Sequence, residues 1–108
     1  MGTLDFDAMQ KMQRQLHEKY LEKWGPLSPQ LGRELLLWMM GEAGEVGDII
    51  KKNGDASIVE DEKIHHDFVE EMCDVLMYFN DVMLCYSISP EELAKTYEEK
   101  HNRNMNRW

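Results

Sequence analysis

Apolar side chains recur every three or four residues along most of the chain, a spacing that places them on one face of an α-helix. On this pattern we expect four helices, which cover about residues 5–24, 29–52, 62–86 and 90–104. The apolar stripe of the first helix consists of Met9, Met12, Leu16 and Tyr20. Gly25-Pro26 ends this helix. No alternating run of Val, Ile and Thr is bounded by turn residues, so the pattern predicts an all-α fold.

Turn and capping residues mark the ends of the other helices. Asn53-Gly54 is a normal C-terminal cap for the second helix. Ser89, with Glu92 three residues later, forms a capping box at the start of the fourth. Residues 53–61 are the longest connection, and we expect them to be a mobile loop.

Length, charge and cysteine spacing narrow the class of protein. The chain has 108 residues, so we expect a single domain over residues 1–108. Its net charge of −9 disfavours binding to nucleic acid, and an anionic ligand would need a metal ion as intermediary. The sequence has no long apolar run and no signal-peptide pattern, so we expect a cytoplasmic protein without a membrane partner. Cys73 and Cys85 fall on one predicted helix, about 18 Å apart, so we expect free thiols.

The second predicted helix carries two glutamates in an unusual place. On a wheel of about 100° per residue, Glu42 and Glu45 lie in the middle of the apolar face. That face consists of Leu35, Trp38, Met39, Val46 and Ile49. Glutamate is rarely buried unpaired, so the two either reach the edge of the face, meet a Lys or Arg, or bind metal. Three glycines near these glutamates weaken the helix unless a close neighbour or a ligand compensates: Gly41, Gly44 and Gly47.

The third predicted helix is apolar nearly all round except for one acidic stripe. Its main apolar face consists of Val69, Met72, Leu76, Phe79 and Met83. The acidic stripe consists of Asp67, Glu70, Glu71, Asp74 and Asp81, with Tyr78 among them. Like charges at this spacing repel one another, so the stripe calls for a counter-ion. A helix that is apolar on most sides is typical of a buried position or an oligomer interface.

The two acidic patterns can meet if the second and third helices pack antiparallel. The chain between Glu45 and Glu71 is long enough for a turn and a return. Glu42 and Glu45 would then face Glu71 and Asp74. Four carboxylates without sulfur or imidazole form a hard oxygen site, which favours Mg²⁺, with Mn²⁺ as a possible substitute.

These residues resemble the MazG-like all-α nucleoside triphosphate pyrophosphohydrolase superfamily, whose mark is ExxE on one helix and ExxD on the next. Here the motifs are Glu42 with Glu45 and Glu71 with Asp74, within the strings GEAGEVGDIIKK and EEMCDVLMYF. The resemblance covers about residues 28–108 and implies a four-helix chain that forms an oligomeric helical bundle. It also implies Mg²⁺-dependent hydrolysis of an NTP or dNTP to the monophosphate and pyrophosphate, in housecleaning of the nucleotide pool.

The resemblance assigns roles to further residues. The four carboxylates would hold the metal, and Glu42 or Glu45 would orient or deprotonate the water that attacks the α-phosphorus. The phosphates would meet a basic cluster near the C-terminus, whose best matches are Lys100, Asn104 and Arg107. Asn102 and Arg103 fit the cluster in another register, and a basic helix end is also favoured by the helix dipole alone.

The resemblance also suggests a base pocket and an assembly. Aromatic residues hold the base in relatives, and the candidates here are Tyr78 and Trp38, with Trp24 a weaker one. Aromatic residues at such spacing are also ordinary core residues. Relatives build their sites from more than one subunit, so we expect a homo-oligomer, either a dimer or a tetramer.

Three alternatives remain open. Phosphoribosyl-ATP pyrophosphohydrolases share the acidic helix pair, which leaves the substrate undecided. A ferritin-like di-iron bundle needs Glu-x-x-His on two helices, and Glu62 with His65 and Glu98 with His101 match that spacing. A non-catalytic helical interaction or regulatory module would account for the nine methionines but leaves Glu42 and Glu45 unexplained.

Overall fold

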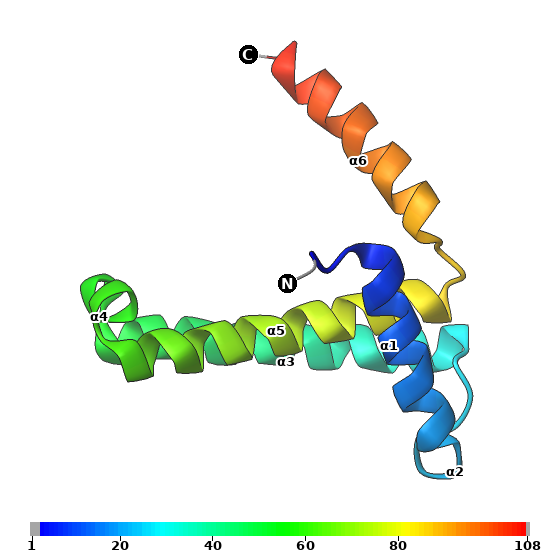
Figure 1. Ribbon diagram of the computed structural model, residues 1–108, viewed down its shortest axis with the longest axis horizontal. Helices are drawn as coiled ribbons and strands as arrows, with labels where there is room; N and C mark the ends of the chain where they lie inside the picture. Colours follow the sequence, from blue (N-terminus) through cyan, green and yellow to red (C-terminus); the bar gives the residue numbers. More distant parts are fainter. Residues whose placement is uncertain (1–2, 108) are drawn as a thin grey trace.

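The computed structural model describes residues 3–107, which form six helices and no strand (Figure 1). The all-α prediction is therefore confirmed. The helices are α1 (Phe6–Lys19), α2 (Leu21–Trp24), α3 (Pro29–Asn53), α4 (Asp55–Glu60), α5 (Glu62–Cys85) and α6 (Pro90–Met105). Residues 1–2 and Trp108, the two ends of the predicted 1–108 domain, lie outside the described residues.

Helices α3 and α5 form the centre of the molecule as a long antiparallel pair (Figure 1). Both start at a side-chain cap: Ser28 Oγ accepts from the Leu31 amide at 3.2 Å. Asp61 Oδ1 accepts from the Ile64 amide at 3.1 Å and caps α5. The bounds of both helices agree with the predicted ones to within a residue. The antiparallel return that brings the two acidic motifs together is therefore present.

Two short helices were not predicted. The first predicted helix is interrupted at Tyr20, after which α2 brings the Trp24 ring to 5.2 Å from that of His17 and 4.9 Å from that of Tyr20. Gly25, at φ +76°, ends α2 where the sequence placed the helix end. The expectation of a loop over residues 53–61 is wrong, because residues 55–60 form α4.

Helix α4 closes the far end of the α3–α5 pair. Gly54, at φ +83°, ends α3 as predicted, and its amide donates to the Ile50 carbonyl. His65 Nδ1 on α5 donates to the carbonyl oxygen of Ile58 at 2.9 Å, which ties α4 to α5. This contact between residues seven apart is a tertiary feature that helical periodicity does not reveal.

Helix α1 crosses α5 and packs on it with a polar face. Its buried residues are Gln10, Gln13 and His17. Met12 on the predicted apolar stripe is instead 52% exposed. The reason lies in α5, which presents buried Asn80 and Asp81 to α1 and so requires polar partners there.

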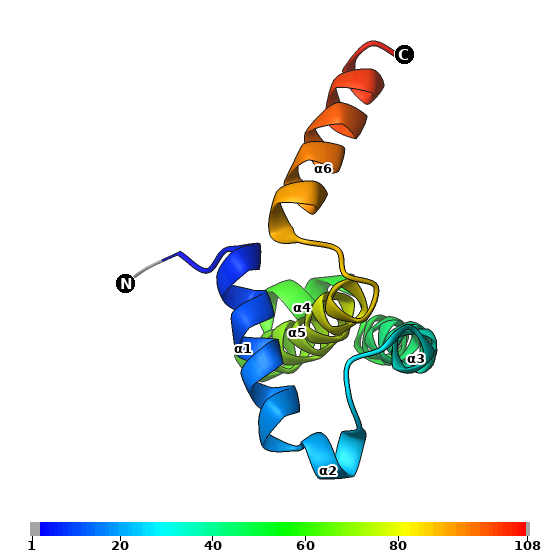
Figure 2. The same cartoon turned by 90° about the vertical axis from the view of Figure 1, so that its right-hand side faces the viewer.

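Helix α6 projects away from the rest of the chain in both views (Figures 1 and 2). Its capping box is confirmed, since Ser89 Oγ accepts from the Glu92 amide at 3.1 Å. Among the described helices, α6 contacts only α1. The radius of gyration is 16.3 Å, whereas a compact domain of this length has about 13 Å. The chain alone is thus more extended than a typical globular domain.

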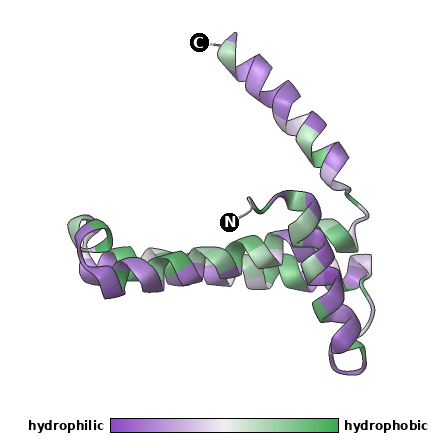
Figure 3. Ribbon diagram, viewed as in Figure 1, coloured by the Kyte–Doolittle hydropathy of each residue, from purple (hydrophilic) through white to green (hydrophobic). Residues whose placement is uncertain are grey.

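Hydrophobic residues follow one another along α3 and α5 (Figure 3), and many of them are exposed in this chain. The accessible surface is 8562 Å², against about 6,300 Å² for a compact monomer of this mass. Within residues 3–107, the buried apolar residues are Val46, Val82 and Cys85. The predicted apolar face of α5 is largely exposed, at Val69, Met72 and Leu76.

The structure also bears on the cysteines and on membrane insertion. Cys73 and Cys85 are free thiols, as expected. Burial raises the pKa of the Cys85 thiol. None of the helices in residues 3–107 has the length and apolarity that a membrane crossing needs.

Candidate functional site

Three carboxylates converge in the middle of the α3–α5 pair. Glu42 and Glu45 lie one turn apart on α3, and Glu71 comes from α5. Each offers an oxygen atom, and these three atoms all lie within 4.8 Å of one another. The antiparallel packing of the two helices thus produces the grouping that the sequence predicted.

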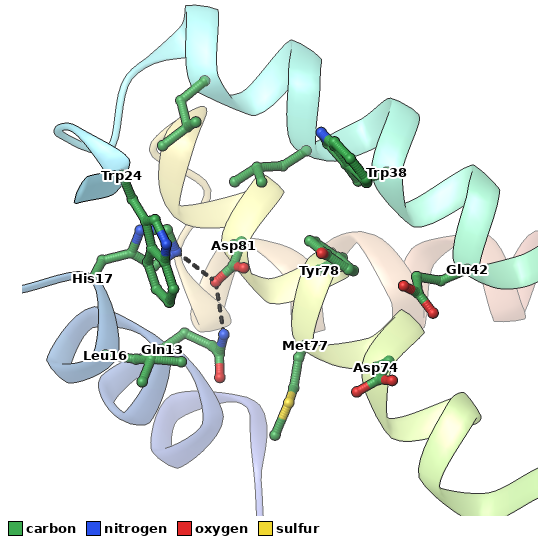
Figure 4. Close-up of a pocket in the computed structure, with 12 residues that line it drawn as sticks. Gln13, Leu16, His17, Trp24, Trp38, Glu42, Asp74, Met77, Tyr78 and Asp81 are labelled. Carbon is green, nitrogen blue, oxygen red and sulfur yellow. Dashed lines mark hydrogen bonds and ion pairs between the residues drawn. The ribbon is translucent and has the colours of Figure 1, made fainter. Parts of the chain in front are cut away.

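Asp74, one turn along α5 from Glu71, completes the acidic cluster. Figure 4 shows the Asp74 and Glu42 side chains together between α3 and α5. The pKa of Glu42 is raised, mainly by burial and then by the negative charges of Glu45, Asp74 and Glu71. Within residues 3–107, no ion pair joins any of the four to a cation. We call these four residues the acidic cluster.

The acidic cluster fits a hard divalent cation. Its donors are all carboxylate oxygens, the ligand type that Mg²⁺ and Mn²⁺ prefer. Glu45 is exposed, so the cluster is open to an ion and its water ligands from solvent. A cation bound there would relieve the mutual repulsion that raises the pKa of Glu42.

The other members of the predicted acidic stripe have separate partners. Asp67 pairs with Lys63 at 3.1 Å, one turn earlier on α5. Glu70 lies 2.9 Å from His66, also one turn earlier. Asp81 contacts α1. Of the acidic stripe, Glu71 and Asp74 therefore remain for a counter-ion shared with Glu42 and Glu45, because Asp67, Glu70 and Asp81 each have a partner of their own.

The three α3 glycines near the acidic cluster are not explained by close packing within the chain. A Cβ atom added at Gly41, Gly44 or Gly47 would meet nothing within 4 Å. The tight approach is instead at Gly32, where an added Cβ would lie 2.8 Å from Cys85 Cβ and 2.8 Å from the Tyr86 ring. Along the acidic cluster, the glycine side of α3 is open.

A groove of about 540 Å³ runs from the acidic cluster toward α1. Glu42 and Asp74 line one part of it, and Tyr78 and Trp38, the two predicted base-binding residues, line the middle (Figure 4). Burial raises the pKa of the Tyr78 hydroxyl, and the negative charge of Glu42 raises it further. Trp38 is 62% exposed, so a ligand rather than the chain itself would cover its ring.

The α1 part of the groove contains three polar residues that the sequence analysis did not connect. Asp81 Oδ1 accepts from Gln13 Nε2 at 2.8 Å, and it lies 3.2 Å from His17 Nε2 (Figure 4). All three are buried, and Trp24 packs edge-on against His17. The available signal was the spacing of Gln13 and His17, one turn apart on the polar flank of α1 next to its apolar stripe.

The predicted phosphate-binding residues lie on α6, away from the acidic cluster. Lys100, Asn104 and Arg107 line one hollow of this helix together with Arg103. Asn102, the other alternative in the register, does not line it. Since α6 contacts neither α3 nor α5 in the described structure, one chain does not bring the basic and acidic groups together.

A ferritin-like di-iron arrangement does not form in this chain. Glu62 and His65 lie at the start of α5, and the His65 ring is bonded to the α4 backbone. Glu98 and His101 lie on α6, which does not pack on α5. The two Glu-x-x-His pairs therefore do not face a common centre.

Comparison of the chain with family models, curated proteins and solved structures finds no match. What indicates the function is therefore the acidic cluster, the groove beside it and the basic hollow of α6.

Proposed function

We propose that this chain is a Mg²⁺-dependent nucleoside triphosphate pyrophosphohydrolase of the MazG-like kind. Its substrate would be an NTP or dNTP, and its products the monophosphate and pyrophosphate. The observation that carries the proposal is the convergence of Glu42, Glu45 and Glu71, with Asp74 beside them, without a cation. The aromatic groove that starts at this cluster supports a nucleotide as the ligand.

The acidic cluster can serve both to hold metal and to move a proton. Bound Mg²⁺ would supply charge neutralisation for the phosphates and an activated water. In the reaction, water oxygen forms a bond to the α-phosphorus while the bond to the pyrophosphate oxygen breaks. Glu42 or Glu45 would take the proton from that water.

The groove gives the nucleotide an orientation. With the α-phosphate at Glu42 and Asp74, the sugar and base would extend along the groove past Tyr78 toward α1. Tyr78 is half-buried and offers a ring face in a fixed position, whereas exposed Trp38 would be covered when the base is bound. Stacking on aromatic rings is favourable for any base, so these two residues hold the ligand without selecting it.

We further propose that the active form is a homo-oligomer in which α6 of one copy reaches the acidic cluster of another. The support is the separation of the basic hollow from the acidic cluster within one chain, together with their opposite charges. The exposed apolar residues on α5 would be buried in the same assembly. Lys100 and its neighbours would then contact the β- and γ-phosphates.

The first experiment measures pyrophosphate release from a panel of NTPs and dNTPs with Mg²⁺, Mn²⁺ or EDTA. Wild-type protein should give monophosphate and pyrophosphate only with metal, and Glu45→Gln should lose more than about a hundredfold in rate, as expected for a lost metal ligand. Glu70→Gln is the matched control, since Glu70 is an exposed α5 carboxylate paired with His66 outside the cluster. It should retain activity.

The panel also contains phosphoribosyl-ATP. Turnover of that compound alone would replace the proposed substrate and keep the reaction type. No turnover of any nucleotide would contradict the proposal. Thermal stabilisation by Mg²⁺ and not by Na⁺ at the same ionic strength, lost in Glu45→Gln, tests the metal site without activity.

A subunit-mixing experiment tests the shared site. Light scattering should give a dimeric or larger mass, and a monomer at micromolar concentration would contradict the assembly. Glu45→Gln and the double variant Lys100→Ala/Arg107→Ala should each be inactive alone. Mixed after dissociation, they should recover about a quarter of wild-type activity, because half of randomly mixed dimers hold one intact site of two. Recovery would be absent if each chain built its site alone.

A further inference from the structure

Asp81 lies at the end of the groove away from the acidic cluster, and the proposed reaction does not use it. It is only 6% exposed, yet it lines the groove together with Tyr78 and His17. It stands two helical turns from Asp74 along α5, too far to be part of the acidic cluster. A buried carboxylate in such a place is either purely structural or available to a ligand.

The bonding of Asp81 is one-sided. Gln13 Nε2 and His17 Nε2 both approach the same oxygen, Oδ1. The other oxygen, Oδ2, has no hydrogen bond or ion pair within residues 3–107. Figure 4 shows the Asp81 carboxyl between the α1 side chains on one side and the Tyr78 ring on the other. The oxygen without a partner therefore belongs to the groove.

Gln13 and His17 fix the direction of the carboxyl group. They lie one turn apart on α1, so their two donors approach from one rigid element. The Trp24 ring packs against His17 and holds it in place. Since the carboxyl group cannot rotate without losing both bonds, Oδ2 is a preoriented acceptor in a largely apolar groove. An acceptor of this kind is costly unless water or a ligand donates to it.

We propose that Asp81 selects the base of the nucleotide by accepting a hydrogen bond from an exocyclic amino group. This inference rests on the proposed function, since it requires the base to lie beside Tyr78. An ionised carboxylate only accepts, so it favours the amino group of cytosine or adenine and repels a carbonyl oxygen in the same place. The preferred substrates are therefore amino-bearing nucleotides, over uracil, thymine and hypoxanthine nucleotides.

Two matched substrate pairs test the proposal: dCTP against dUTP, and ATP against ITP. The members of each pair carry an amino group or a carbonyl oxygen at the same ring position. Wild-type kcat/KM should favour the amino member by about tenfold or more, the usual discrimination of one well-placed polar contact. Equal rates within a pair, in a protein that hydrolyses both, would overturn the inference and leave the proposed function standing.

The decisive variant is Asp81→Asn. The amide oxygen of the new side chain can still accept from Gln13 and His17, which turns its NH₂ group toward the groove. The ratio of kcat/KM for the amino member to kcat/KM for the carbonyl member should then fall to about one, or below one. Asp67→Asn, a change at an exposed α5 carboxylate outside the groove, should leave the wild-type ratio unchanged. An unchanged ratio in Asp81→Asn would overturn the inference.

Binding of the products keeps the test independent of turnover and of the folding of the variant. Calorimetry with dCMP and dUMP measures the same contact in wild-type protein, even if no triphosphate is hydrolysed. Tighter binding of dCMP supports the role of Asp81, and equal affinities contradict it. If wild-type protein hydrolyses no nucleotide but still binds dCMP more tightly than dUMP, the proposed reaction is contradicted and the role of Asp81 in base selection stands.

Discussion

Asp74 and Asp81 lie on the same stripe of α5, two turns apart, yet their surroundings are opposite. Asp74 stands with three other carboxylates, and no cation within residues 3–107 pairs with it. Asp81 is buried and receives two hydrogen-bond donors from α1. The same residue type on one helix is thus left uncompensated at one place and fully oriented at the other.

The difference shows in the electrostatics of the two places. Burial raises the pKa of Asp81, but the bonds from Gln13 and His17 counteract that effect. Every contribution to the shift of Glu42, the representative of the acidic cluster, acts in the raising direction. No donor therefore offsets the negative charges around Glu42, whereas Gln13 and His17 offset part of the cost of burying Asp81. Uncompensated charge of this kind is typical of a binding site.

The largest expected difference between Asp81 and Asp74 is in how much each contributes to the free energy of unfolding. Asp81→Ala should lower the free energy of unfolding by about 2 kcal/mol, because it leaves the Gln13 and His17 donors buried without an acceptor. Asp74→Ala should leave it unchanged or raise it in the absence of metal, since it removes repulsion. Urea unfolding in EDTA measures both. Equal losses in the two variants would mean that the acidic cluster is structural.

The same two regions differ in how tightly α3 is packed. Gly32→Ala, near the Asp81 end, should destabilise by about 1–3 kcal/mol, since the added methyl group would meet the Cβ of Cys85. Gly47→Ala, beside the acidic cluster, has open space and should stabilise by up to about 1 kcal/mol through helix propensity. Thermal unfolding of both variants tests this. Destabilisation by Gly47→Ala would show that another copy covers this side of α3.

Much of the framework could be predicted because it depends on local signals. The caps at Asn53-Gly54 and Ser89 and the helical period predicted the bounds of the long helices. The meeting of Glu42 and Glu45 with Glu71 followed from two consecutive long helices that residues 53–61 join. These features depend on residues near one another in the sequence.

The features that were missed depend on contacts between distant residues. Met12 and Leu16 form a clear apolar stripe, but the side of α1 that is buried depends on what α5 presents to it. A helical wheel places Asp81 with the acidic stripe, and only the packing of α1 separates it from Asp74. The direction of α6 likewise has no local signal. The two short helices also involve contacts with a neighbouring helix, between His17 and Trp24 and between Ile58 and His65.

The smallest expected effect is a pH dependence that belongs to the acidic cluster. The pKa of Glu42 in the folded protein is raised above its ordinary value of 4.5. The folded state then binds the proton more tightly than the unfolded state, so this group's contribution to stability is present at low pH and is lost as the pH rises through the folded pKa. Glu42→Gln removes that contribution and leaves Asp81, whose pKa is also raised, in both proteins.

Melting temperatures of wild-type and Glu42→Gln protein, measured in EDTA from about pH 4, below the ordinary pKa, up to about pH 8, isolate the effect. Wild-type protein should lose stability relative to the variant as the pH rises. Mg²⁺ should stabilise the wild type most at pH 8 and least at the acid end, because protons and metal compete for the same carboxylates. A difference between the two proteins that is independent of pH would show that Glu42 is not strained by its neighbours, and the contrast between the acidic cluster and Asp81 would then lose its electrostatic basis.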